Sequence, residues 1–185
     1  MSYKKYFEIL GINIGTDTQF ICDSVMESLE SLRNSSYSDK TNAIYQLCEG
    51  LNKDRMESLK GESHKCSEDI FNSHSGYFSS RKQEEFHIIL FDNQHRVIEM
   101  KMVSKGILNK SLVHPREVFA PAIEKRAAAI VLVHNHPSGD PKPSKADFDI
   151  TRRLKECGEL IGISILDHLI IAGGLYYSFV DESTI

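Results

Sequence analysis

The sequence predicts an α/β domain in which a mixed β-sheet is flanked by helices, with a small helical extension at the N-terminus. Segments with the 3.6-residue apolar period of helices alternate, from residue 84 onward, with short apolar or alternating runs typical of strands. The chain has 185 residues, of which 41% are hydrophobic and 26% charged, as expected for one soluble globular domain with an extension. The longest apolar run, Ala127 to Val133, is too short to span a bilayer.

Residues 1–62 are predicted to form a helical extension of unknown role. Apolar positions recur near the helical period over residues 17–33 and again over 39–51. Residues 61–66 have the composition of a linker, and Ser67 can cap a short helix that runs to about residue 79. The second domain is therefore expected to span residues 67–185.

Two strands are expected first in this second domain. Phe86 to Phe91 is almost continuously apolar, which indicates a strand buried on both faces. Arg96 to Val103 alternates, and the turn-forming residues 92–95 between the two runs predict a hairpin.

Two helices and three strands follow. A helix begins at His114-Pro115, because proline fits the first helical position, and runs to about residue 126. Residues 127–133 predict a central strand, and residues 144–157 a helix that Gly158 ends. The last two strands are expected over residues 163–172 and 175–180, joined by a glycine pair.

Charge and cysteine usage narrow the class of protein. Residues 81–185 carry equal numbers of basic and acidic residues, so the net charge of −4 comes from residues 1–80. Neither part has the cationic footprint that nucleic-acid binding usually requires. The residues before Gly11 include no apolar stretch of signal-peptide length, so a cytoplasmic protein without membrane contact is expected. The cysteines are scattered without Cys-x-x-Cys spacing and are expected to be reduced thiols: Cys22, Cys48, Cys66 and Cys157.

A metal-binding pattern follows the predicted central strand. His134 and His136 are two residues apart, so their side chains point to one face and can converge on one ion. Asp147, in the first turn of the next helix, can supply a third ligand. Two nitrogens and one oxygen leave the fourth tetrahedral position open, which is typical of a catalytic Zn²⁺. Ser144 and Asp147 also have capping-box spacing, and a His-x-His pair alone is often ordinary; together they favour a metal site.

The same residues carry a resemblance. A His-x-His, then seven residues, a serine, two residues and an aspartate match the JAB/MPN+ (JAMM) metalloprotease motif. The flanking residues resemble its bacterial RadC branch over about residues 67–185, which implies the JAB fold, similar to that of cytidine deaminases. The segments that carry the resemblance to this branch are His134 to Asp140, Val113 to Phe119 and Leu166 to His168.

The resemblance also implies roles for further residues. The motif includes a glutamate at the start of an earlier strand that acts as general base and then acid; the matching position is taken as Glu85, with Glu84 as the alternative. Ser144 would hydrogen-bond the oxyanion, and a single zinc ion would serve the hydrolysis of a peptide or isopeptide bond. Four residues match only the RadC branch: His114, Asp140, Asp167 and His168. Asp140 or His168 could orient a ligand imidazole, and hydrogen bonds that fix loops are the alternative.

Three functions compete on this basis. The first is a zinc-dependent peptidase or isopeptidase acting on a peptide or protein. The second is a DNA repair or recombination protein that acts on or near DNA without peptidase activity. RadC proteins usually begin with a helix-hairpin-helix region, and residues 1–60 contain no convincing version of it. The third is a silent scaffold, but such domains lose the ligands that this chain retains.

Overall fold

The computed structural model describes residues 50–79, 81–106 and 113–184, and the chain divides into two units at Ser58 and Leu59. Within the first unit the described residues, 50–58, are helical. The helix predicted over residues 17–33 lies outside the described residues, as do residues 39–49 of the helix predicted over 39–51; its last two residues are described and helical. None of the described helices combines the length and apolar character that crossing a lipid bilayer requires.

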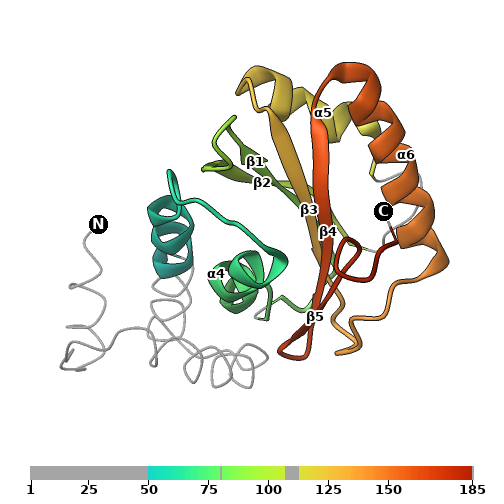
Figure 1. Ribbon diagram of the computed structural model, residues 1–185. Helices are drawn as coiled ribbons and strands as arrows, with labels where there is room; N and C mark the ends of the chain where they lie inside the picture. The colour runs from blue at the N-terminus through green and yellow to red at the C-terminus, as the bar shows by residue number, and fades with distance from the viewer. Residues whose placement is uncertain (1–49, 80, 107–112, 185) are drawn as a thin grey trace. The chain divides into compact units, whose positions relative to one another are not determined.

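The second unit is built on a five-stranded sheet with the order β2-β1-β3-β4-β5 (Figure 1). The pairs β1–β2, β1–β3 and β4–β5 are antiparallel, whereas β3 and β4 run parallel. The predicted mixed sheet with flanking helices is thereby confirmed. The strands are β1 (Glu85–Phe91), β2 (Val97–Lys105), β3 (Ala129–Asn135), β4 (Ser164–Ala172) and β5 (Leu175–Ser178).

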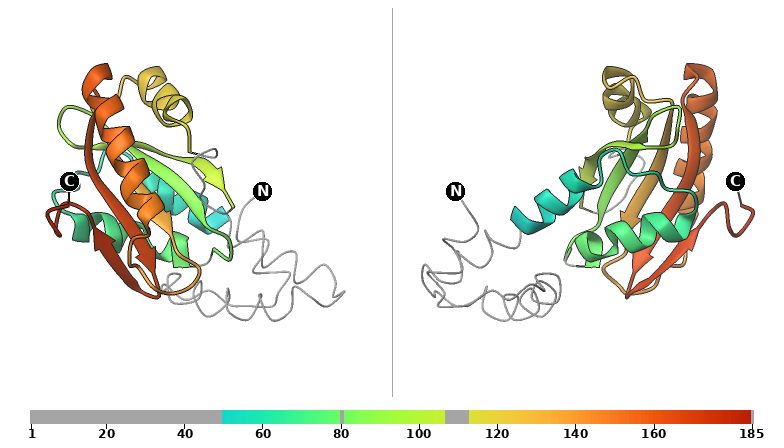
Figure 2. Two further views of the ribbon diagram at one scale, coloured as in Figure 1. Left: turned by 90° about the vertical axis from the view of Figure 1, so that its right-hand side faces the viewer. Right: turned by 60° about the vertical axis from the view of Figure 1, so that its left-hand side comes forward.

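Three helices cover the sheet, and Figure 2 shows that they lie on opposite faces of it. The helix α4 (Ser67–Ser79) packs on one face, while α5 (Pro115–Glu124) and α6 (Lys145–Ile161) pack on the other. β1 and β3 are buried on both faces because both layers cover them, as the unbroken apolar run of β1 predicts.

Alternation along β1 decides which residues enter which layer. Phe86, Ile88 and Leu90 join the core beneath α5 and α6, whereas Ile89 and Phe91 join the core beneath α4. The residues just before Phe86 therefore also belong to opposite faces, and this alternation places the functional site.

Two boundaries differ from the sequence prediction. Residues 61–63, predicted as a linker, bond to the start of β2 through Gly61 N–H to Val97 O (2.8 Å) and Val97 N–H to Glu62 O (2.9 Å). The helix expected to stop at Gly158 continues to Ile161, where Gly162 (φ 80°) forms the cap.

Gly158 is instead a point of close approach. It is buried inside α6, and a Cβ atom there would lie 2.5 Å from the carbonyl oxygen of Ile163 and 3.4 Å from the Phe119 ring. Its missing side chain lets the chain turn back beneath α6 into β4.

We expect Gly158→Ala to lower the free energy of unfolding by about 1–3 kcal/mol, because the added methyl group meets main-chain atoms that cannot move aside. Glu159→Ala, an exposed change on the same helix, is the matched control and should alter stability little. Denaturant unfolding of the two variants checks this, and equal stabilities would contradict the close approach.

Candidate metal centre

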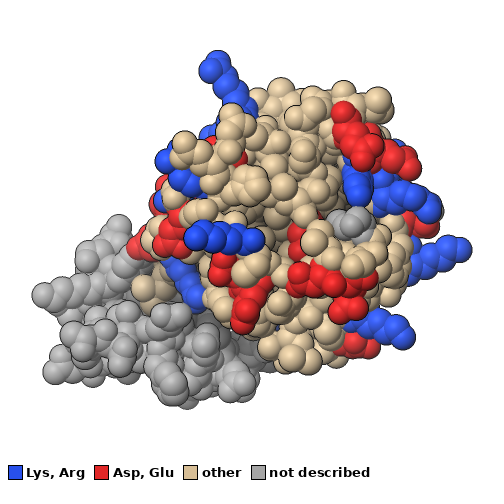
Figure 3. Space-filling model, viewed as in Figure 1, with Lys and Arg blue, Asp and Glu red and all other residues tan. Residues whose placement is uncertain are grey.

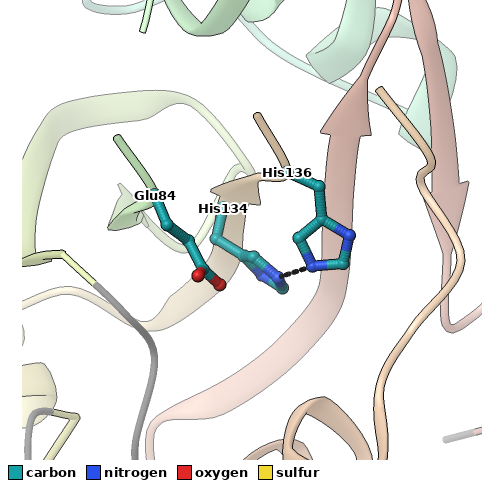
Figure 4. A group of neighbouring side chains, drawn as sticks. All are labelled: Glu84, His134 and His136. Atoms are coloured by element: carbon teal, nitrogen blue, oxygen red, sulfur yellow. Dashed lines mark hydrogen bonds between the residues drawn. The ribbon is translucent and has the colours of Figure 1, made fainter. Parts of the chain in front are cut away.

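Two imidazoles meet where β3 ends. His134 is fully buried within β3, and His136 follows the strand with 16% of its side chain exposed. Their Nε2 atoms lie 3.0 Å apart (Figure 4). The predicted convergence of the two side chains on one point is therefore present in the structure.

The ring of His136 is oriented by the loop that follows it. Its Nδ1–H donates to the backbone carbonyl of Asp140 over 2.9 Å, so its Nε2 carries the lone pair. The Asp140 carboxylate instead accepts from the Lys142 N–H (2.9 Å) and so stabilises the loop.

The ring of His134 is oriented by a chain of three buried hydrogen bonds. The Thr151 hydroxyl donates to the Asp147 carbonyl (2.5 Å), so toward His168 Nδ1 (2.6 Å) it can only accept. A neutral His168 then accepts at Nε2 from His134 Nδ1–H (2.8 Å), which leaves the lone pair of His134 on Nε2.

Burial supports the neutral forms of His134 and His168. It lowers the pKa of His168 well below its usual value, and His134 and His136 lower it further. Burial likewise lowers the pKa of His134, against the opposing influence of the Asp147 carboxylate. Two nitrogen lone pairs thus face each other at 3.0 Å, an arrangement that a shared cation would stabilise.

Asp147 completes a set of three donors. Its Oδ1 lies 3.3 Å from His134 Nε2 and its Oδ2 lies 3.7 Å from His136 Nε2. Donors bound at about 2.0–2.2 Å to a tetrahedral ion are separated by about 3.3–3.6 Å, so these separations, with the 3.0 Å between the two nitrogens, are close to those that a tetrahedral metal ion requires. The carboxylate is 1% exposed and is held by the Ser144 N–H (2.6 Å), while the Ser144 hydroxyl accepts from the Asp147 N–H. The predicted capping box is therefore also present.

A second carboxylate approaches from β1. Glu84, His134 and His136 each offer a ligand atom, and these atoms lie within 4.8 Å of one another, so this trio could also hold a metal ion. Figure 4 shows the half-buried Glu84 pointing toward the His134 ring from the strand entry. Two carboxylates therefore flank the imidazole pair.

Glu85, the preferred candidate for the general base, does not face the imidazoles. It lies on the α4 face of the sheet, where its carboxylate contacts Lys105 Nζ at 2.9 Å, His87 Nε2 at 3.1 Å and Arg81 Nε at 3.8 Å. Burial raises the pKa of Glu85, but hydrogen bonds from His87 and Lys105 and the charge of Arg81 outweigh it and lower the pKa to about 2. Glu85 is an ion-paired structural residue.

The four residues specific to the RadC branch divide between the two open roles. His168 orients His134 through its side chain, and Asp140 orients His136 through its main-chain carbonyl. His114 caps α5 by accepting from the Arg116 N–H (3.1 Å), and Asp167 accepts from the Ser178 hydroxyl (2.6 Å) and the Val180 N–H (3.0 Å) to fix the last turn.

Thr151 was not singled out from the sequence. It lies one helical turn after Asp147, so the helical period places both side chains on the same face of α6. That spacing was the available signal, but it does not reveal that His168 of β4 lies against the threonine.

The fold and the site define an α/β domain with a candidate metal centre at the carboxyl end of its central strand. Residues 64–184 match the model of the RadC-like JAB domain, which covers well over half of the chain. The chain belongs to this RadC family, as the resemblance predicted.

Relatives of this family align with most of the chain. It is 44% identical over 138 residues to a UPF0758 protein of Geobacter sulfurreducens, covering 75% of this chain and 60% of that protein. It is 46% identical over 140 residues to one of Geotalea uraniireducens, with 76% and 60% covered, and 41% identical over 162 residues to one of Clostridium botulinum, with 86% and 71% covered. The chain thus spans about 60% of the length of the first two relatives. None of these names states an activity.

The hydrogen-bond chain behind His134 generates a prediction on metal affinity. Thr151→Val keeps the side-chain shape but removes the acceptor for His168, so the His134 ring loses its fixed tautomer. We expect Zn²⁺ to bind about 10-fold more weakly or worse. Thr151→Ser, which keeps the hydroxyl, is the matched control. Competition with a chromophoric chelator measures both, and equal affinities for the two variants would contradict the role of the chain.

Glu85 generates a prediction on stability and pH. Its folded-state pKa of about 2 lies below its ordinary value of 4.5, so ionised Glu85 stabilises the fold above pH 4.5, and this contribution is lost as the pH falls toward 2. Glu85→Gln should therefore lower the melting temperature at pH 7, by an amount that shrinks below pH 4.5. Thermal unfolding against pH measures this, with the exposed Glu117→Gln as control. A difference that does not change with pH would contradict the assignment.

Proposed function

We propose that this domain is a zinc-dependent hydrolase that cleaves a peptide or isopeptide bond. The observation that carries the proposal is the pair of Nε2 lone pairs 3.0 Å apart, each fixed by a hydrogen bond at its own Nδ1 and each facing the Asp147 carboxylate. A donor set of two imidazoles and one carboxylate, which leaves the fourth tetrahedral position without a protein ligand, is that of catalytic rather than structural zinc.

We assign the two carboxylates different tasks. Asp147 is the third ligand, because it is buried, held by the Ser144 N–H and within 3.3 and 3.7 Å of the two nitrogens. Glu84 is the proton carrier, because it comes from a different strand, is half-buried and reaches the same imidazoles from the side of β1. The assignment replaces Glu85, whose carboxylate is engaged on the opposite face of the sheet.

The chemistry follows from these positions. A zinc ion held there would supply Lewis acidity that lowers the pKa of a water molecule toward neutrality. In the proposed reaction Glu84 would take a proton from the attacking water and later return it to the leaving amine. The Ser144 hydroxyl accepts from the Asp147 N–H, so its own hydrogen can be directed to the oxyanion of the substrate.

Zinc analysis and peptide hydrolysis of four variants test the proposal. His136→Ala and Asp147→Asn should lose the metal. Glu84→Gln should keep it and lose turnover by a factor of about 10²–10⁴. Glu85→Gln, the neighbouring carboxylate, is the matched control and should keep both properties at a temperature where it is folded.

Each opposite result has a definite meaning. Metal loss in Glu84→Gln together with metal retention in Asp147→Asn would exchange the two roles. A zinc-loaded protein that cleaves neither a peptide library nor isopeptide-linked substrates would refute the proposed hydrolysis.

A role on or near DNA is the competing function of this family. On the face seen in Figure 3, basic and acidic side chains of the described residues are interspersed on both sides and across the lower middle, while the upper middle is largely uncharged. Such mixing does not favour contact with a phosphate backbone. Duplex DNA binding measured against salt concentration separates this function from hydrolysis.

A further inference from the structure

We propose that Asn135, the residue between the two histidines, is a positioning residue that sets the location of Glu84. Its Oδ1 accepts from the Glu85 N–H at 2.9 Å, and its Nδ2 donates to the Gln83 carbonyl at 3.1 Å. The two hydrogen bonds thus hold the main chain at the residues immediately before and after Glu84. The inference rests on the proposed function, because it concerns the group that carries the proton.

The segment before β1 needs these two hydrogen bonds because the pairing of β1 with β3 ends just after it. Pairing between β1 and β3 ends at Phe86 and His134. Beyond this pair the chain continues to bond to β4 on its other edge, with His136 N–H donating to Ile171 O at 3.0 Å. The amide of Asn135, 3% exposed, then takes over the donor and acceptor that main-chain pairing would have supplied to β1.

A second contact holds the other side of the same segment. Gly106 N–H donates to the Glu84 carbonyl at 2.7 Å. The strand entry is therefore held from both edges, while the Glu84 side chain reaches toward the imidazoles. A proton carrier must be held to a fraction of an ångström, and a displacement of about 1 Å can cost about 100-fold in rate.

The metal ligands are held by other groups. His168 orients His134, the Asp140 carbonyl orients His136, and the Ser144 N–H holds Asp147. Loss of the Asn135 amide should therefore change the position of Glu84 and leave metal binding in place. A residue that only stabilised the end of the sheet would, when replaced, affect stability, metal binding and the position of Glu84 together.

The decisive variant is Asn135→Leu in the full 185-residue chain. Leucine is similar in size to asparagine but offers neither a donor nor an acceptor, so the hydrogen bonds to the Gln83 carbonyl and from the Glu85 N–H are both lost. The third main-chain contact of this segment, from Gly106 N–H to the Glu84 carbonyl, does not involve Asn135 and remains.

We expect kcat of Asn135→Leu to fall by about 100-fold relative to wild type, because Glu84 is displaced. KM and zinc affinity should change little, because other groups hold the metal ligands. An unchanged kcat, or a loss of zinc affinity as large as the loss of kcat, would overturn the inference.

A measurement that does not depend on catalysis tests the role of Asn135 independently of the proposed hydrolase activity. In the Co²⁺-loaded protein, we expect Glu84→Gln to shift the pH midpoint of the visible absorption spectrum, and Asn135→Leu to shift it in the same direction. Asn135→Leu should add nothing in the Glu84→Gln background, because both act through one carboxylate.

The Co²⁺ outcomes decide both ideas. Wild-type protein that binds Co²⁺ but cleaves no substrate would refute the hydrolase proposal, while the midpoints would still decide the role of Asn135. Additive shifts, or no shift with Asn135→Leu, would overturn the positioning role. A protein that bound neither Zn²⁺ nor Co²⁺ would overturn both.

Discussion

The candidate centre depends on how the far sides of two imidazole rings are hydrogen-bonded. His134 donates from Nδ1 to His168, and His136 donates from Nδ1 to the Asp140 carbonyl. The lone pairs of both rings are then on Nε2, and the two Nε2 atoms lie 3.0 Å apart and face each other. Metal-binding histidines usually have such a partner behind the ring, which fixes the tautomer and raises the basicity of the ligand. The loop after β3 contributes the Asp140 carbonyl, α6 contributes the Thr151 hydroxyl and β4 contributes His168.

The two neighbouring glutamates show how a strand separates stability from chemistry. Consecutive side chains point to opposite faces, so Glu84 reaches the imidazole layer under α6 and Glu85 enters the α4 layer. There the carboxylate of Glu85 contacts Lys105, His87 and Arg81, and these ion pairs stabilise the fold. The Glu85 side chain thus contributes to stability, while main-chain contacts of the same segment hold Glu84.

Much of the fold was predictable from local pattern, because apolar period, the proline at the start of α5 and the glycine pair between β4 and β5 are local signals. The boundaries of α6 were not, because Gly158 resembles a helix stop in sequence and only the approach of Ile163 shows why glycine is required inside the helix. The motif placed His134, His136 and Asp147 on neighbouring elements. The choice between Glu84 and Glu85 required the cross-strand register of Phe86 with His134, which a strand apolar on both faces does not reveal.

Helix capping and metal binding need not compete at Asp147. Within the capping box, Oδ2 accepts the Ser144 N–H, while Oδ1 lies on the side of His134 Nε2 at 3.3 Å. The cap removes the torsional freedom of the carboxylate before any ion arrives, so less conformational entropy is lost on binding. The capping-box spacing of Ser144 and Asp147 therefore also preorganises Asp147 as a candidate metal ligand. The fixed backbone of the first turn of α6 also keeps the Ser144 hydroxyl beside that carboxylate, where the proposed hydrolysis would need a donor to the oxyanion.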